Sequence, residues 1–185
     1  EGLKLATPKL LKLFERQGVK GTFYFVGAAA RACPASVTTV AEAGHEIGAH
    51  SLFHETMGDP LFPIPGDHPG LASEVKPRLA LNTDWVEEIA GMRPVSFRCP
   101  RLFGSTAVCN ALNELGYVSD ASYPLYYHTR QLEPYHPSST DWTKPGDLKL
   151  VEIPNFADLS ITSRDPYWRD RDQWPKFRTE SADAL

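Results

Sequence analysis

The chain has 185 residues, 42% of them hydrophobic and 23% charged, which is the composition of one globular domain and excludes a wholly disordered chain. Nineteen Lys and Arg against 23 Asp and Glu give a net charge of −4, which argues against a nucleic-acid partner, because such surfaces normally carry a basic excess. No stretch approaches the ~18 to 20 apolar residues of a membrane span. We therefore expect a single domain over residues 1–185 with no transmembrane span.

The chain begins with Glu1 and lacks the basic and then apolar opening of a secretory leader, so we expect a processed chain or part of a longer one. Three cysteines, Cys33, Cys99 and Cys109, are too few and too odd in number for a disulfide framework. Buried free thiols are the favoured interpretation, with one bridge as the alternative. The cellular compartment and the oligomeric state stay open.

The first elements alternate between helix and strand. Thr7 and Pro8 are typical of the start of a helix, which we expect to end at Gly18. The aromatic and β-branched run within residues 21–27 predicts a buried strand. A second helix over residues 34–43 and a second strand over residues 45–50 follow.

The same alternation continues downstream. Leu81, Trp85 and Ile89 recur at the i+4 spacing of a helix that ends at Gly91, and a helix capped by Ser105 is expected next. Three further strands are predicted over residues 95–98, 117–122 and 148–154. About five strands and four helices in alternation predict a parallel α/β core, with too few strands for a closed barrel.

Two segments interrupt this alternation. Residues 58–70 are rich in proline, and residues 123–137 carry four tyrosines and two histidines. Both are expected to be long loops, which in compact domains are often functional, although a surface excursion packed by its own aromatic side chains is equally consistent.

The most informative motif is the pair His50 and His54. His50 falls at the carboxyl end of a predicted strand, where parallel α/β folds collect their sites. Two imidazoles four residues apart can hold one zinc ion, although core histidines at this spacing are common.

Two further polar residues follow predicted strands. Arg98 can grip a carboxylate with two parallel hydrogen bonds, or serve in a surface salt bridge. Asp120 can orient a ligand histidine or an arginine, or cap a turn.

Several segments in order resemble the polysaccharide deacetylases, the NodB-homology carbohydrate esterases. They are Thr7-Pro8 with a Leu-rich helix, Gly18-Val-Lys-Gly-Thr-Phe-Tyr-Phe-Val-Gly27, Gly44-His-Glu-Ile-Gly-Ala-His-Ser-Leu-Phe-His54, Phe97-Arg-Cys-Pro100, Gly116-Tyr117 with Asp120, and Val151-Glu-Ile-Pro154. The resemblance runs to about residue 155. It is similar above all to the branch with peptidoglycan-deacetylase-like and allantoinase-like proteins.

The resemblance implies a distorted (β/α) barrel of about seven strands, lacking its first and last strand motifs in this chain. It implies a divalent metal, usually zinc, on His50, His54 and an Asp, and hydrolysis of an acetamide by metal-activated water. Arg98 would hold the base carboxylate, and the backbone N–H of Arg101 would stabilise the oxyanion. A late histidine would protonate the leaving amine.

Three features depart from the family pattern. The Thr-Phe-Asp-Asp-Gly strand, which supplies the base and the carboxylate ligand, should precede Thr7, where only six residues stand and none is Asp. No histidine occurs after His136 to supply the acid, and Arg101 stands where the family often has an aromatic residue or Gly. We expect both terminal motifs to lie outside this sequence, with a binding protein that does not catalyse as the alternative.

The leading prediction is a metal-dependent deacetylase of an N-acetylated or O-acetylated glycan. The alternatives are a C–N hydrolase of a small cyclic amide and a catalytically inactive glycan-binding barrel. A glycan needs an open groove with aromatic platforms, whereas a small amide suits a closed pocket. The candidate platforms, which are equally consistent with packing, are Tyr126, Tyr127, Trp142, Trp168 and Trp174.

Overall fold

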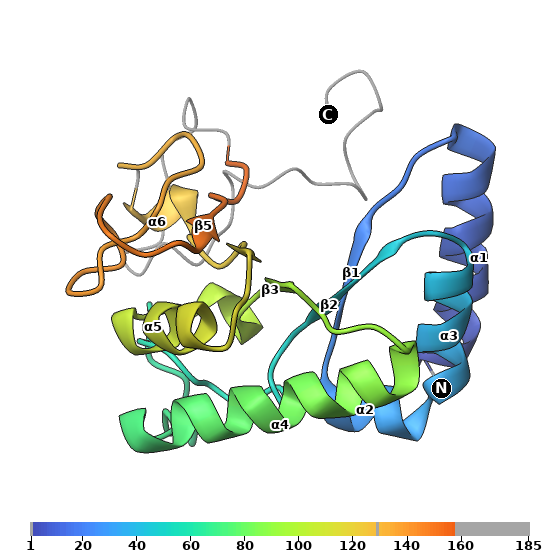
Figure 1. The fold of residues 1–185 in the computed structure, drawn as a ribbon, viewed down its shortest axis with the longest axis horizontal. Coiled ribbons are helices and arrows are strands. Elements are labelled where there is room, and N and C mark those ends of the chain that lie inside the picture. Colours follow the sequence, from blue (N-terminus) through green and yellow to red (C-terminus); the bar gives the residue numbers. More distant parts are fainter. Residues whose placement is uncertain (1, 129, 158–185) are drawn as a thin grey trace.

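A five-stranded parallel sheet forms the centre of the computed structural model, which describes residues 2–128 and 130–157 (Figure 1). Its strands follow the chain order β1-β2-β3-β4-β5, and every neighbouring pair is parallel. The strands are β1 (Thr22–Phe25), β2 (Glu46–Ala49), β3 (Ser96–Phe97), β4 (Ser119–Asp120) and β5 (Val151–Glu152). Because all five run in the same direction, the segments that follow them meet at one edge of the sheet.

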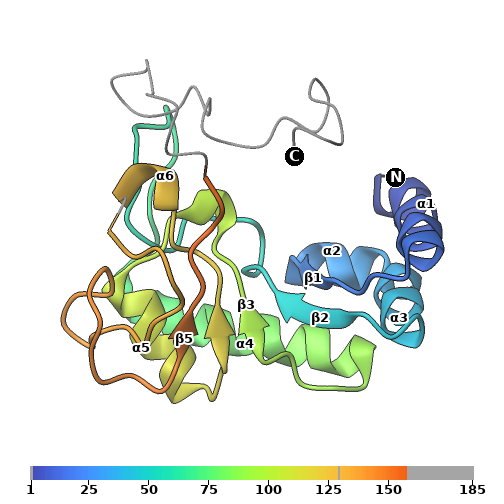
Figure 2. The ribbon, with the colours of Figure 1, turned by 90° about the horizontal axis from the view of Figure 1, so that it is seen from above.

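Six α-helices and one 3₁₀ turn occupy the connections in the described part of the chain (Figures 1 and 2). The α-helices are α1 (Gly2–Gln17), α2 (Gly27–Ala32), α3 (Pro34–Glu42), α4 (Ala72–Ala90), α5 (Thr106–Glu114) and α6 (Leu125–His128), and the 3₁₀ turn is η1 (Pro100–Leu102). The long helix α4 contacts α2, α3 and α5 as well as β2, and α1 packs on α3. None of the described helices is long and apolar enough to cross a membrane.

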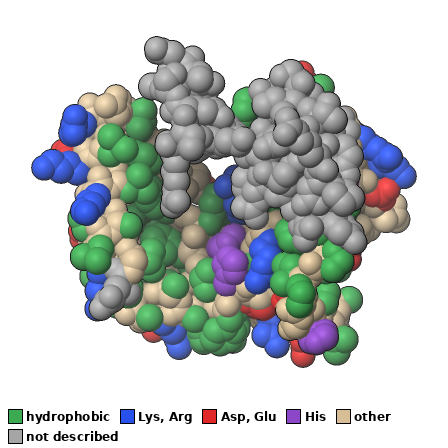
Figure 3. Space-filling model, turned by 180° about the vertical axis from the view of Figure 1, so that it is seen from behind, with side chains coloured by type: hydrophobic (Ala, Val, Ile, Leu, Met, Phe, Trp, Pro, Cys, Tyr) green, Lys and Arg blue, Asp and Glu red, His purple; other side chains and the backbone are tan. Residues whose placement is uncertain are grey.

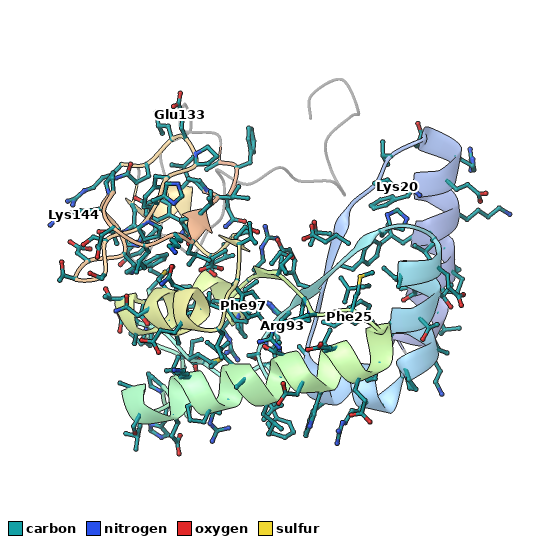
Figure 4. The ribbon with its side chains drawn as sticks, in the orientation of Figure 1. Lys20, Phe25, Arg93, Phe97, Glu133 and Lys144 are labelled. Atoms are coloured by element: carbon teal, nitrogen blue, oxygen red, sulfur yellow. The ribbon has the colours of Figure 1, made fainter. Side chains whose placement is uncertain are left out.

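The core consists of two clusters joined by α4. Phe97 of β3 is fully buried in one cluster together with Leu79 of α4, and Phe25 of β1 is buried in the other together with Val86 of the same helix. Figure 4 labels both phenylalanines, which lie between the strands and α4. The apolar face of one helix thus fixes the positions of the strand ends that carry the candidate site.

The alternating strands and helices predicted from the sequence are confirmed, and so is the N-cap of α5. The Ser105 side chain accepts a hydrogen bond from the backbone N–H of Val108. Cys33, Cys99 and Cys109 are free thiols, two of them buried, as expected. The seven strands of a distorted barrel are not confirmed, since five are present in the residues that the structure describes.

The predicted helix start at Thr7 and Pro8 is wrong. Helix α1 begins at Gly2 and runs through Pro8, and Thr7 is buried inside it. Leu3, Thr7 and Leu11 follow one another at i+4 spacing, and Leu3 and Leu11 belong to a core cluster. The burial of this face outweighs the one intrahelical hydrogen bond that a proline removes.

Other differences concern short elements. Helix α2 was not predicted, because Gly-Ala-Ala-Ala-Arg-Ala has no apolar periodicity. Helix α4 contains Pro77, which made its start uncertain from the sequence. Residues 58–70 carry no helix or strand, as expected, whereas residues 123–137 include the single helical turn α6.

Candidate metal centre and its surroundings

The polar residues singled out from the sequence lie at the carboxyl edge of the sheet. His50 follows β2, Arg98 follows β3, and Asp120 is the last residue of β4. Strand register keeps them on neighbouring strands, since Ala49 pairs with Phe97 and Phe97 pairs with Asp120. The chain therefore brings together three positions that are up to 70 residues apart in sequence.

His50 and His54 lie side by side, with ring centroids 5.1 Å apart. The Nδ1 atom of His50 lies 2.5 Å from the backbone carbonyl oxygen of Arg98, so it is the protonated nitrogen that donates this bond. Nε2 then carries the lone pair, which is the arrangement found in histidines that bind metals. Burial lowers the pKa of His50 to about 4, so the ring is neutral and can act as a ligand at neutral pH.

Backbone strain is concentrated in the two loops that carry this edge. Among the described non-glycine residues, positive φ angles occur at four positions, all of them directly after β2 or β3. They are Ser51 (62°), His54 (63°), Arg101 (58°) and Leu102 (63°). Left-handed conformations cost non-glycine residues about 1 to 2 kcal/mol each and gather at functional sites.

Arg98 points its guanidinium along the same edge. Its Nε donates to the carbonyl oxygen of Ala121 at 3.0 Å, and its Cζ lies 5.0 Å from the centroid of the Tyr24 ring. No salt bridge among the described residues joins Arg98 to a carboxylate. Its guanidinium is thus held by a backbone carbonyl and an aromatic face.

Arg101 fastens the proline-rich loop to the η1 turn. Its Nη1 donates to the Thr56 hydroxyl at 3.0 Å and lies 3.8 Å from Oδ2 of Asp67, while the Thr56 hydroxyl donates to that same carboxylate. The backbone N–H of Asp59 donates to the Gly104 carbonyl at 3.0 Å. The side chain of Arg101 therefore organises the loop, while its backbone remains at the edge of the sheet.

Asp120 is fully buried. Its Oδ1 accepts a hydrogen bond from the Ser122 hydroxyl at 2.5 Å, and its partner in the parallel register of β4 and β5 is Glu152. Glu152 is also fully buried, and its Oε1 accepts from the backbone N–H groups of Ser122 and Tyr123 at 2.9 and 2.7 Å. Sequence reasoning missed Glu152 and Ser122 as site residues, although an acid within a predicted buried strand is a signal for one.

The candidate aromatic platforms have different environments. Trp142 is 5% exposed, packs edge-on against Tyr123 and lies close to Gly104. It lines, with Tyr127, a surface cavity of about 440 Å³ formed by segments that follow β2, β3 and β4. The side chain of Tyr126 and the whole of Trp168 and Trp174 lie outside the described residues.

The described ligand-type side chains form one group of three, and it is not the histidine pair. A carboxylate oxygen each of Asp120 and Glu152 and the sulfur of Cys109 lie within 4.8 Å of one another, and all three residues are buried. The histidine pair lies separately at the sheet edge, where the proton on Nδ1 of His50 leaves Nε2 as the nitrogen that could bind a metal. Figure 3 shows histidine side chains grouped near the centre of one face, next to basic side chains.

A family model for polysaccharide deacetylases matches residues 1–119 of this chain. A peptidoglycan-N-acetylglucosamine deacetylase of Bacillus cereus is 26% identical over 145 residues, which are 78% of this chain and 58% of that protein. A peptidoglycan deacetylase of Helicobacter pylori is 25% identical over 164 residues, 82% of this chain and 53% of that protein. The chain thus spans about half the length of the curated relatives that it matches.

Solved structures show the same architecture. A Mycobacterium smegmatis protein classed among the polysaccharide deacetylases superposes with a TM-score of 0.66 at 27% identity, covering 83% of this chain and 46% of that one. An allantoinase superposes with a TM-score of 0.60 at 22% identity, covering 85% and 46%, which shows the fold alone. With the family model covering well over half of the residues, the chain belongs to the polysaccharide deacetylase family.

Proposed function

We propose that this chain forms part of a metal-dependent hydrolase that removes acetyl groups from N-acetylated or O-acetylated carbohydrate. The observation that carries the proposal is the His50 and His54 pair at the carboxyl edge of the sheet, with Nδ1 of His50 committed to the Arg98 carbonyl. Membership of the polysaccharide deacetylase family supports a carbohydrate substrate.

In this proposal His50 and His54 hold a divalent metal, most simply zinc, through imidazole nitrogens. When bound, such an ion polarises the acyl oxygen and lowers the pKa of a coordinated water. The Arg98 carbonyl fixes the His50 ring, so that Nε2 is preorganised to face the ion. The proposal assigns no described residue to the general base, the carboxylate ligand or the acid.

Arg98 and Arg101 have separate roles in the proposed reaction. The Arg98 guanidinium, held through Nε by Ala121, would present its remaining N–H groups to the carboxylate of the base. The backbone N–H of Arg101, held in a left-handed turn by the side-chain contacts to Thr56 and Asp67, would stabilise the tetrahedral oxyanion. Tyr127 and Trp142, which line the cavity of about 440 Å³, would contact neighbouring sugar units.

Sequence similarity to peptidoglycan deacetylases supports a polymeric carbohydrate substrate over a small cyclic amide. The allantoinase likeness is one of fold, at 22% identity.

Zinc content provides the first test. His50→Ala and His54→Ala should each abolish stoichiometric zinc binding by the full-length protein, measured by emission spectrometry. His136→Ala is the matched control, since Nδ1 of His136 also contacts a backbone carbonyl, that of Leu150, at 3.0 Å. Unchanged zinc in either of the first two variants would show that the ligand assignment is wrong.

Turnover provides the second test. Acetate should be released from N-acetylated or O-acetylated oligosaccharides, and no ring-opened product should form from a cyclic amide. Arg98→Ala should lower kcat for acetate release by roughly 10²-fold or more with zinc retained. Hydrolysis of the cyclic amide alone would support the alternative. Glycan binding without any hydrolysis by the zinc-loaded protein would support the inactive barrel.

A further inference from the structure

A pair of carboxyl groups is buried at the carboxyl ends of β4 and β5. Asp120 and Glu152 are directly paired in the register of β4 and β5, and neither is exposed to solvent. Each has one oxygen already engaged: Oδ1 of Asp120 by the Ser122 hydroxyl, and Oε1 of Glu152 by two backbone N–H groups. The two remaining oxygens, Oδ2 and Oε2, are buried without a partner among the described residues.

A carboxylate oxygen of Asp120 lies within 4.8 Å of one of Glu152, so one proton shared between the two unpartnered oxygens would satisfy both of them. If both groups were ionised, two negative charges would face each other at neighbouring positions of the buried sheet, which is strongly unfavourable. None of the salt bridges in the described part of the chain gives either carboxyl a cationic partner. When one protonated carboxyl group donates to the other carboxylate, the pair carries one negative charge in place of two, and both oxygens gain a hydrogen-bond partner.

The other titratable groups around the pair do not replace this proton. Burial raises the pKa of the Cys99 and Cys109 thiols, so both are neutral and neither supplies a positive charge. Arg98 is the cation that acts on Asp120, and its Nε is committed to the Ala121 carbonyl. Among the described residues, the hydroxyls of Tyr24, Tyr123 and Tyr135 also act electrostatically with Glu152, and burial raises the pKa of each.

Hydrogen bonds connect this pair to the metal-binding edge. The Ser122 hydroxyl, which donates to Asp120, also accepts from the backbone N–H of Cys99 at 2.8 Å. Cys99 directly follows Arg98, whose carbonyl oxygen accepts the hydrogen bond from Nδ1 of His50. The position of the turn over residues 98–101 is therefore tied to the carboxyl pair on one side and to the His50 ring on the other.

We propose that Asp120 and Glu152 share one proton and act together as positioning residues for the 98–101 turn, and through it for His50. The part that concerns catalysis rests on the proposed function. Neither carboxyl touches the metal or the substrate in this proposal. Asp120 thus acts through Ser122 and Glu152, in place of the two roles predicted from the sequence, which were orienting a histidine or an arginine and capping a turn.

Amide variants test the shared proton. In Asp120→Asn or in Glu152→Gln, the new NH₂ group replaces one unpaired oxygen and donates to the other carboxylate, so each single variant keeps the pair. In the double variant two NH₂ groups face each other, and no acceptor remains between them. Each single variant should stay within about threefold of the parent in kcat, and the double variant should fall at least about tenfold below the product of the singles.

Ser122→Ala tests the connection to the turn, because it removes the hydroxyl that joins Asp120 to the Cys99 amide and keeps the backbone N–H that donates to Glu152. Hydrogen exchange at the Cys99 backbone amide should become at least about tenfold faster, because this N–H loses its buried acceptor. The expected loss of turnover is in kcat, with KM within about threefold of the parent. Ser96→Ala is the matched control, since Ser96 is a buried serine of β3 whose hydroxyl has no partner in the described part of the chain.

Several outcomes would overturn the proposal. Additive effects of the two amide substitutions would exclude a shared proton, and so would a single variant as impaired as the double one. Loss of a bound metal from either single variant, or from Cys109→Ser, would show that the buried group holds an ion instead. An unchanged rate of hydrogen exchange at the Cys99 amide in Ser122→Ala would exclude the positioning role. This rate and the denaturation midpoints of the amide variants test the proposal even if the parent hydrolyses no glycan.

Discussion

Gly58 gives a sharp test of how the proline-rich loop is seated on the η1 turn. A Cβ atom added at Gly58 would lie 2.0 Å from the carbonyl oxygen of Phe103 and 2.6 Å from the carbonyl carbon of Gly104. Both atoms belong to the backbone, so no side-chain rotation relieves the clash and the loop must move. The movement would also break the hydrogen bond from the Asp59 N–H to the Gly104 carbonyl.

The expected cost of Gly58→Ala has two parts. Overpacking against a fixed backbone costs about 1 to 3 kcal/mol, and the lost hydrogen bond costs about 1 kcal/mol. Together they should lower the free energy of unfolding by roughly 2 to 4 kcal/mol, which is a large part of the ~5 to 15 kcal/mol typical of a domain.

Urea denaturation of the full chain measures this cost, and Gly70→Ala is the matched control in the same loop. A Cβ at Gly70 would meet nothing closer than the Thr56 carbonyl at 3.8 Å, so this variant should stay within about 0.5 kcal/mol of the parent. If Gly58→Ala is as stable as Gly70→Ala, the contact between the loop and the turn is not a fixed one and the reasoning fails.

Two further predictions concern the contacts of Arg101 with the proline-rich loop and the buried carboxyl group of Glu152. Arg101→Ala should expose residues 58–70 to limited proteolysis about tenfold faster than in the parent, because the contacts to Thr56 and Asp67 are lost, and unchanged cleavage would show that the loop is held without them. Burial, with Asp120 alongside, raises the pKa of Glu152 well above its usual 4.5, so the folded state retains a proton that the unfolded state releases. This contribution to stability is complete below about pH 4.5 and is lost as the pH rises toward the folded-state pKa. The free energy of unfolding of the parent should therefore fall relative to that of Glu152→Gln by up to about 1.4 kcal/mol per pH unit above pH 4.5, and equal pH slopes in chemical denaturation would contradict it.

The sequence predicted the strands and most of the helices because their signals are local. Ser105 caps α5 through a contact three residues away, and the β1 and β2 runs lie between glycines. The start of α1 depended instead on the balance between a local cap signal and the burial of a helix face in the core. The cap signal at Thr7 competed with the burial of a face that includes Leu3 and Leu11, and packing decided.

The candidate site was predictable where each residue stands at the end of a strand, as His50 and Arg98 do. The partners of these residues depend on register between strands that are distant in sequence. That Asp120 faces Glu152 follows from the pairing of β4 with β5, which 30 intervening residues leave undetermined in the sequence. The contacts of the Arg101 side chain with Thr56 and Asp67 could not be predicted for the same reason. The long helix α4 separates these two residues from Arg101 in the sequence.

The left-handed residues after β2 and β3 have a consequence for how this protein tolerates substitution. At Ser51 or Leu102, glycine would remove a conformational penalty of about 1 kcal/mol, although for Leu102 the gain would be offset by lost packing. At His54 the strained backbone and the proposed metal ligand are the same residue, so a glycine there would relieve the strain and remove the ligand together. Selection for thermal stability alone would therefore favour loss of His54, so under the proposed function the metal ligand is held at a cost in stability.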